Sequence, residues 1–284
     1  MNFWKAIFGG RELTAEEEQQ ERKDKNFDLL KYDGVKAMKM GQADYAVRCF
    51  EEALKLTDDM EVRDYLSQTL MRLGRFDEAM EHLKLMAEAE PENVVVRLQM
   101  ANVAYMKEDY ALLESICQQA LATMPDDERL YFFAARASVG LEQPEQALDR
   151  LDRALQLRDD YADARLLRGR VLLNLGRIAE ADADSQWLID YAGSHEDVLM
   201  FKAQVETAKG DAEAARHLYS LVIEVNPFSA QAYLSRAALL DAMGLHDEAQ
   251  ADRQQARELD PEQNEEDIEQ QVKQAYKNAS PFGI

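Results

Sequence analysis

A phrase repeated at a fixed distance is the feature that most limits how this chain can fold. Residues 74–93, GRFDEAMEHLKLMAEAEPEN, and residues 244–263, GLHDEAQADRQQARELDPEQ, both open with Gly-x-x-Asp-Glu-Ala and both reach a proline within an acidic stretch. Gly74 and Gly244 are 170 residues apart, which is five times 34. Steps of 34 residues between them lead to further breaks between helical patterns, at Glu108, Glu142, Gly176 and Gly210. Self-similarity at such a period is typical of repeat architectures.

Two further columns keep the same register. A column dominated by alanine lies five residues after each break, at Ala46, Ala79, Leu113, Ala147, Ala181, Ala215 and Ala249. A second column is rich in proline: Pro91, Pro125, Pro227 and Pro261, with Asp58, Asp159 and Gly193 in the remaining places. Each period contains two apolar patterns of helical spacing, and the break between them supplies a C-cap and then an N-cap. The sequence therefore predicts stacked pairs of helices, with the small residue where two helices cross.

This pattern resembles the tetratricopeptide repeat (TPR), a 34-residue unit with Ala-x-x-x-Phe in its second helix and a closing proline. The first copy contains Gly34, Gly41, Ala46, Phe50 and Ala53, and the sixth contains Ala203, Gly210, Ala215, Tyr219 and Pro227. Some copies depart from the pattern, through Leu113, Ser185 and Arg253. The resemblance implies an all-α fold: a right-handed α-solenoid, or superhelix, of about seven TPR helical hairpins with a C-terminal capping helix.

We expect the chain to have three parts. Residues 1–26 hold an apolar segment and a charged helix that begins at a capping box, Thr14 to Glu17. Residues 262–284 hold a capping helix and tail, because Ile268, Val272 and Tyr276 form one narrow apolar stripe that suits the end of a stacked array. Residues 27–261 between them are predicted to form seven repeats, at 27–59, 60–93, 94–127, 128–161, 162–195, 196–229 and 230–261.

Charge and hydropathy narrow the classes of partner. The chain has 55 acidic and 33 basic residues and a net charge of −22. Nucleic acid and anionic membrane surfaces are bound through clustered Lys and Arg, so both are disfavoured. No uncharged run approaches the roughly 18 to 20 residues that span a bilayer, and the N-terminal apolar stretch is too short for a signal peptide. We therefore expect a cytoplasmic protein with no integral membrane segment and no nucleic-acid partner.

No arrangement of residues in the sequence predicts catalysis. The four histidines, His82, His195, His217 and His246, fall at different places in different repeats. None has a partner at the spacing of a metal site, and no Gly-rich phosphate loop is present. Cys49 and Cys117 lie in amphipathic helical patterns, which favours buried free thiols. We expect no enzyme activity, no cofactor and no metal site.

The resemblance places a binding groove on the first helix of each repeat. Columns four residues apart on that helix share one face, and the predicted groove consists of Gln68, Leu98, Asn102, Arg129, Phe132, Arg136, Leu166, Arg170, Met200 and Gln204. Amides can satisfy the backbone of an extended peptide, and arginine can hold a carboxylate with two hydrogen bonds. This predicts a protein or peptide partner with an acidic or C-terminal carboxylate group at Arg136 and Arg170. Alternatively, the apolar ridge packs between repeats and the arginines pair with acids such as Asp163 or Asp197.

A second contact site is predicted at the N-terminus. Phe3, Trp4, Ile7 and Phe8 share one side of a short helix, and an exposed apolar cluster usually marks a contact. This cluster either folds back on the first repeat or contacts another molecule. The favoured function is a non-enzymatic TPR scaffold or adaptor that binds a peptide or protein segment in its concave groove. The alternative is an assembly factor tethered to a membrane or larger complex through residues 1–10.

Overall fold

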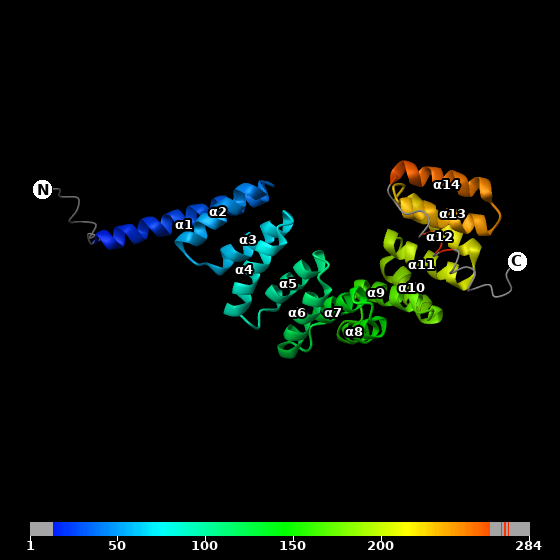
Figure 1. Ribbon diagram of the computed structural model, residues 1–284, viewed down its shortest axis with the longest axis horizontal. Helices are drawn as coiled ribbons and strands as arrows, with labels where there is room; N and C mark the ends of the chain where they lie inside the picture. The colour runs from blue at the N-terminus through cyan, green and yellow to red at the C-terminus, as the bar shows by residue number, and fades with distance from the viewer. Residues whose placement is uncertain (1–13, 262–267, 269, 271, 273–284) are drawn as a thin grey trace. The chain divides into compact units, whose positions relative to one another are not determined.

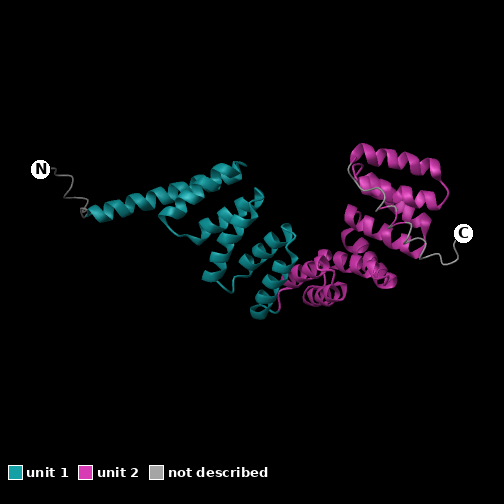
Figure 2. Cartoon of the chain, in the orientation of Figure 1, with its two compact units in different colours: residues 1–125 teal, residues 126–284 magenta. Residues whose placement is uncertain are grey.

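The computed structural model describes residues 14–261 together with residues 268, 270 and 272. Within these residues the chain forms 14 α-helices and no strand (Figure 1). The helices fall into two compact units, Met1–Pro125 and Asp126–Ile284 (Figure 2). Helical hairpins are the building block of both units, and the chain is an all-α solenoid of such hairpins.

The first unit contains three hairpins, with helices α1 (Ala15–Lys39), α2 (Ala43–Leu56), α3 (Met60–Arg72), α4 (Phe76–Ala89), α5 (Val94–Met106) and α6 (Tyr110–Thr123). Each helix of this unit packs against the next one in the chain. The predicted capping box begins α1: the Glu17 amide donates to Oγ1 of Thr14 at 3.2 Å, and the Thr14 amide donates to Oε2 of Glu17 at 2.8 Å. That prediction is confirmed.

The second unit contains four hairpins, with helices α7 (Glu128–Gly140), α8 (Pro144–Leu157), α9 (Ala162–Asn174), α10 (Ile178–Ala192), α11 (Glu196–Lys209), α12 (Ala212–Val225), α13 (Ala230–Ala242) and α14 (His246–Leu259). Here too each helix packs against the next, and α9 also contacts α11. Ile268 packs against a cluster that contains Leu234, while Val272 is buried in a cluster that contains Tyr219. Tyr276, the third member of the predicted stripe, lies outside the described residues.

The break between the helices of a hairpin has a left-handed backbone. Gly74 has a φ of 71°, a conformation that glycine adopts without steric strain. Glu108 and Glu142 occupy the equivalent places in two other hairpins with φ of 55° and 58°. The left-handed backbone is therefore kept even where the residue is not glycine.

Small residues mark the places of closest packing. The alanine column is fully buried, with 0 % exposure at Ala46, Ala79, Ala147, Ala181, Ala215 and Ala249, and the same holds for Leu113. Gly169 in α9 lies against Phe201 of α11, where an added Cβ would sit 2.4 Å from Cζ of the ring. Cys49 and Cys117 are both buried, as the sequence predicts. The core is thus a series of helix crossings, each built on the same small position.

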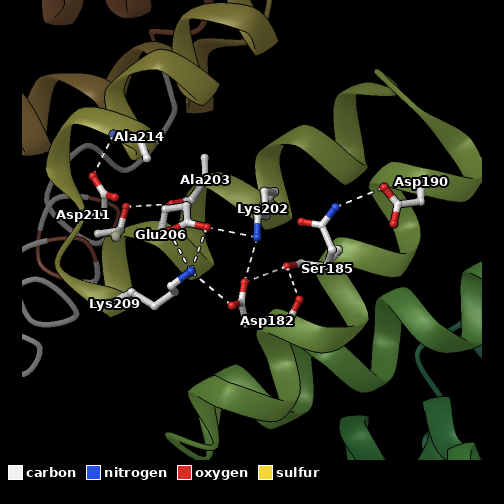
Figure 3. Close-up of polar contacts among 11 residues, drawn as sticks. Asp182, Ser185, Asp190, Lys202, Ala203, Glu206, Lys209, Asp211 and Ala214 are labelled. Atoms are coloured by element: carbon white, nitrogen blue, oxygen red, sulfur yellow. Dashed lines mark hydrogen bonds and ion pairs between the residues drawn. The ribbon is translucent and has the colours of Figure 1, made fainter.

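Ion pairs add to this packing between α10 and α11. Lys202 and Lys209 of α11 both donate to Asp182 of α10, at 2.7 and 3.1 Å (Figure 3). Both lysines also pair with Glu206, at 3.0 Å each. Partial burial alone would raise the pKa of Asp182, but the hydrogen bonds from the two lysines hold it below its ordinary value. The network therefore ties the fifth hairpin to the sixth.

Candidate binding surface

A hollow of about 360 Å³ lies on the first helices of three successive hairpins in the second unit. Arg170 and Asn174 come from α9, Met200 and Gln204 from α11, and Gln231 from α13; Glu196 and Asp197 complete the lining. Three residues of the predicted groove, Arg170, Met200 and Gln204, are therefore brought together. Side chains that are 34 residues apart meet here because each hairpin presents the same face of its first helix.

More acidic than basic side chains line this hollow. Nη2 of Arg170 donates to Oδ1 of Asp197 at 3.1 Å, and both side chains are largely exposed, at 43 % and 77 %. Nδ2 of Asn226 donates to Oε2 of Glu196 at 2.8 Å. With two carboxylates and one guanidinium, the lining carries one net negative charge. An exposed ion pair contributes about 0–1 kcal/mol, so a ligand can replace either partner at small cost.

The other two predicted arginines also have neighbours within the chain. Arg129 donates to Asp127 from Nη2 at 2.6 Å and from Nε at 3.2 Å. These hydrogen bonds are the main reason that the pKa of Arg129 is raised. Burial alone would raise the pKa of Asp127, but the bonds from Arg129 and the Leu130 amide hold it low. The guanidinium of Arg136 lies over the ring of Phe132, with 5.1 Å from Cζ to the ring centroid.

The apolar members of the predicted groove contribute mainly to packing. Phe132 is buried beside Tyr161, with ring centroids 5.1 Å apart, in a cluster that contains Leu151. Leu166 is partly buried against the neighbouring core cluster. Met200 is 6 % exposed and still lines the hollow. Phe132 and Leu166 therefore pack between repeats, as in the alternative that the sequence left open, whereas Met200 also meets the hollow.

The first unit has a hollow of its own, of about 320 Å³. It brings together the predicted Gln68 of α3 and Asn102 of α5, with Arg72, Gln99 and three apolar residues, Met71, Phe76 and Met106. Leu98, the remaining predicted residue of this unit, is half-buried and is not part of the lining. The structure thus assembles two of the three groove residues predicted in this unit.

Asp64 fixes the orientation of two amides beside this hollow. Nε2 of Gln68 donates to Oδ2 of Asp64 and Nε2 of Gln99 donates to Oδ1, both at 2.8 Å. A carboxylate only accepts hydrogen bonds, so the NH₂ group of each amide must face it. Oε1 of Gln99 is then buried with no hydrogen-bond partner in the described part of the chain. An unpaired buried acceptor lowers the free energy of unfolding by about 1–3 kcal/mol. The hydrogen bonding in this wall is therefore incomplete.

Sequence reasoning missed a third column of these surfaces. Arg72, Met106 and Asn174 lie four residues after Gln68, Asn102 and Arg170, one helical turn further along the same face. The spacing of four that links the two predicted columns could have identified them. Gln99, Glu196 and Gln231 line the hollows from other positions, and their contribution depends on how neighbouring helices cross.

Two other predictions concern sites elsewhere in the chain. Phe3, Trp4, Ile7 and Phe8 lie outside the described residues. Over the described ranges, no group of three or more His, Cys, Asp or Glu side chains could hold a metal ion. None of the helices described here combines the length and apolar character that crossing a membrane requires.

Comparisons with known proteins agree with this architecture. Two sequence models of the tetratricopeptide repeat match residues 60–103 and 134–195. The crystal structure of a tetratricopeptide repeat protein from Parabacteroides merdae superposes with a TM-score of 0.71 and 15 % identity, over 88 % of this chain and 99 % of that one. YrrB, described as a TPR protein with an unusual peptide-binding site, gives a TM-score of 0.52 and 17 % identity over 68 % of this chain and 97 % of that one.

A curated relative matches over a shorter stretch. The DnaJ homolog subfamily C member 3 of chicken (Gallus gallus) is 26 % identical over an alignment of 152 residues, and the match covers 48 % of this chain and 30 % of that protein. The chain therefore spans less than a third of the length of this relative. At their levels of identity the two solved structures show the fold alone.

Proposed function

Because the chain belongs to the tetratricopeptide-repeat family, we propose that it is a non-enzymatic scaffold or adaptor that binds an extended segment of a protein partner on the first helices of its hairpins. The fold itself is generally a protein-interaction scaffold. The observation that carries the proposal is the hollow on α9, α11 and α13, where three consecutive hairpins offer side chains to one space.

The chemistry of that hollow suits a peptide main chain. Asn174, Gln204 and Gln231 carry carboxamides, which both donate and accept hydrogen bonds and so match the N–H and C=O groups of an extended strand. Met200 beside them offers a flexible thioether that adapts to different side chains. The peptide-binding site described for YrrB supports the same kind of ligand for a chain of this fold.

The net negative charge of the hollow bears on which segment fits. A ligand carboxylate at Arg170 has to displace Asp197 and also meets Glu196. An uncharged or basic segment meets neither obstacle. We therefore assign the α9, α11 and α13 hollow to main-chain binding, without a requirement for a carboxylate.

Selection of random peptides on the full-length protein tests this function. The first outcome expected is enrichment of specific peptides. The triple variant Asn174→Ala, Gln204→Ala, Gln231→Ala should weaken binding of a synthetic copy of an enriched peptide by about tenfold or more, because it removes several neutral hydrogen bonds of about 0.5–1.5 kcal/mol each.

A matched control is available on the second helices of the same unit. Gln156, Gln186 and Gln254 are exposed amides on α8, α10 and α14, and their replacement by alanine should leave peptide affinity unchanged. Circular dichroism establishes that both triple variants keep their helix content. Absence of any enriched peptide, or equal affinity of the two triple variants, contradicts the proposal.

A further inference from the structure

The hollow of the first unit differs from that of the second in charge. Arg72 is the charged residue of its lining, which otherwise consists of amide and apolar side chains. The lining therefore carries one net positive charge, whereas the hollow on α9, α11 and α13 carries one net negative charge. In a chain with a net charge of −22, a lining without a carboxylate is unusual.

Among the described residues, Arg72 has no partner that would neutralise it. Its side chain is exposed in the last turn of α3 and makes no hydrogen bond or ion pair with any described residue. By contrast, Arg75 at the N-cap of α4 pairs with Glu78, and Arg177 at the N-cap of α10 pairs with Glu180. The nearby carboxylate of Asp64 accepts hydrogen bonds from Gln68 and Gln99 and forms no ion pair with Arg72.

The groups around Arg72 can accommodate a peptide carboxylate together with an apolar side chain next to it. Gln68 lies one helical turn before it, and Asn102 lines the same space from α5, where its amide can donate to an anion. Met71, Met106 and Phe76 give an apolar lining beside these polar groups. Charge complementarity therefore favours an anionic group with an apolar neighbour.

We infer that this hollow of the first unit binds a carboxylate of a segment of a protein partner through Arg72, with an apolar side chain of the same segment against Met71 and Met106. The carboxylate belongs either to an Asp or Glu side chain or to the C-terminus of the segment. The inference rests on the proposed function, and it moves the carboxylate contact from Arg136 and Arg170, where the sequence suggested it, to Arg72.

Arg72 also has a simpler role as a cation at the C-terminal end of α3, where it stabilises the helix dipole. Loss of that role lowers thermal stability slightly and does not change ligand preference. A test must therefore measure binding selectivity, with stability as a separate readout.

The experiment uses random peptides displayed in two formats, with a free C-terminus and with the C-terminus fused to a carrier. Full-length wild type should enrich peptides that carry Asp or Glu, or only peptides with a free C-terminus, and this separates the two sources of the carboxylate. An Arg72→Gln variant should bind a synthetic enriched peptide about tenfold or more weakly, since a hydrogen bond to a charged group is among the stronger kinds. Amidation of the peptide, or Asp→Asn within it, should produce a similar loss.

Arg22→Gln is the matched control, because Arg22 is also an exposed helical arginine of the first unit without a partner among the described residues. It should leave affinity unchanged. Unchanged affinity of Arg72→Gln overturns the inference, as does loss of carboxylate preference in Arg170→Gln instead of Arg72→Gln. Enriched peptides without any carboxylate overturn it too, yet leave the proposed function standing. Failure to enrich any peptide overturns both.

Discussion

Arg168 and Asp184 form an ion pair with two hydrogen bonds between α9 and α10. Nε donates to Oδ2 at 2.9 Å and Nη2 donates to Oδ1 at 2.6 Å, while the side chain of Asp184 is only 3 % exposed. Arg236 and Asp252, two periods of 34 residues further on, have the same arrangement, with both distances at 2.7 Å. The same Arg–Asp pair therefore joins the two helices of two different hairpins in this chain.

Removing the arginine of this pair should be strongly destabilising. Arg168→Met leaves the buried carboxylate of Asp184 with a single weaker contact, from Arg165 at 3.3 Å. Breaking a buried pair in this way costs about 3–5 kcal/mol in the free energy of unfolding, measured by urea denaturation. Arg177→Met, which removes an exposed pair with Glu180, should have a much smaller effect, because solvent screens exposed ion pairs. Similar losses for the two variants would show that the Asp184 site is not closed to water.

The second prediction concerns the close approach of Gly169 and Phe201. Alanine is favoured over glycine in a helix by about 1 kcal/mol, yet here its Cβ would meet the Phe201 ring at 2.4 Å. Gly169→Ala should therefore lower the free energy of unfolding by about 1–3 kcal/mol through overpacking. In a Phe201→Leu background the same substitution should be less damaging, and a double-mutant cycle measures this coupling. Additive effects in that cycle contradict the steric explanation.

The third prediction uses two alanines of one helix. Ala181 in α10 is fully buried at a helix crossing, and Ala183 two residues later is exposed. Ala181→Leu should destabilise the protein by about 1–3 kcal/mol because the added carbons have no space. Ala183→Leu should stay within about 0.5 kcal/mol, as is usual for surface substitutions. Thermal and urea denaturation of the two variants compare the same chemical change in two environments.

Most of the architecture was predictable because packing residues repeat with the period. The alanine column marks helix crossings, and a residue there is constrained by backbone distance, which spacing in the sequence reports directly. The left-handed break also follows from the period, including the glutamates at positions 108 and 142. The capping box at Thr14 was predictable because its hydrogen bonds join residues three apart.

The binding surface was less predictable because side-chain pairing does not follow the period. Asp127 is the N-cap of α7, so its carboxylate lies over the first turn and bonds Arg129. Asp197 reaches Arg170 from the first turn of the next hairpin. Arginines at equal spacing therefore differ in whether a nearby carboxylate pairs with them. Whether an arginine is available to a ligand depends on the acidic residues near it. Arg72, unlike Arg129 and Arg170, pairs with no acid among the described residues.

The last prediction concerns acid stability and Asp182. Its pKa is lowered in the folded state by Lys202 and Lys209, so the network stabilises the fold fully above the ordinary Asp pKa of 3.8. That contribution is lost as the pH falls below 3.8 through the folded pKa. Asp182→Asn should be less stable than wild type at pH 7, and urea denaturation should show the gap closing as the pH falls through this window. A gap that stays constant down to pH 3 contradicts the role given to the network.

Glu108 and Glu142 hold a left-handed backbone that glycine holds in other hairpins. Since glutamate has no preference for this conformation, the helices on either side must impose it. The residue at the break is therefore free to diverge among copies of the unit, whereas the number of residues between break and alanine is not. Gain or loss of a single residue there would move the alanine off its crossing. The copies of this hairpin thus preserve the number of residues between the break and the alanine more strictly than the residue type at the break.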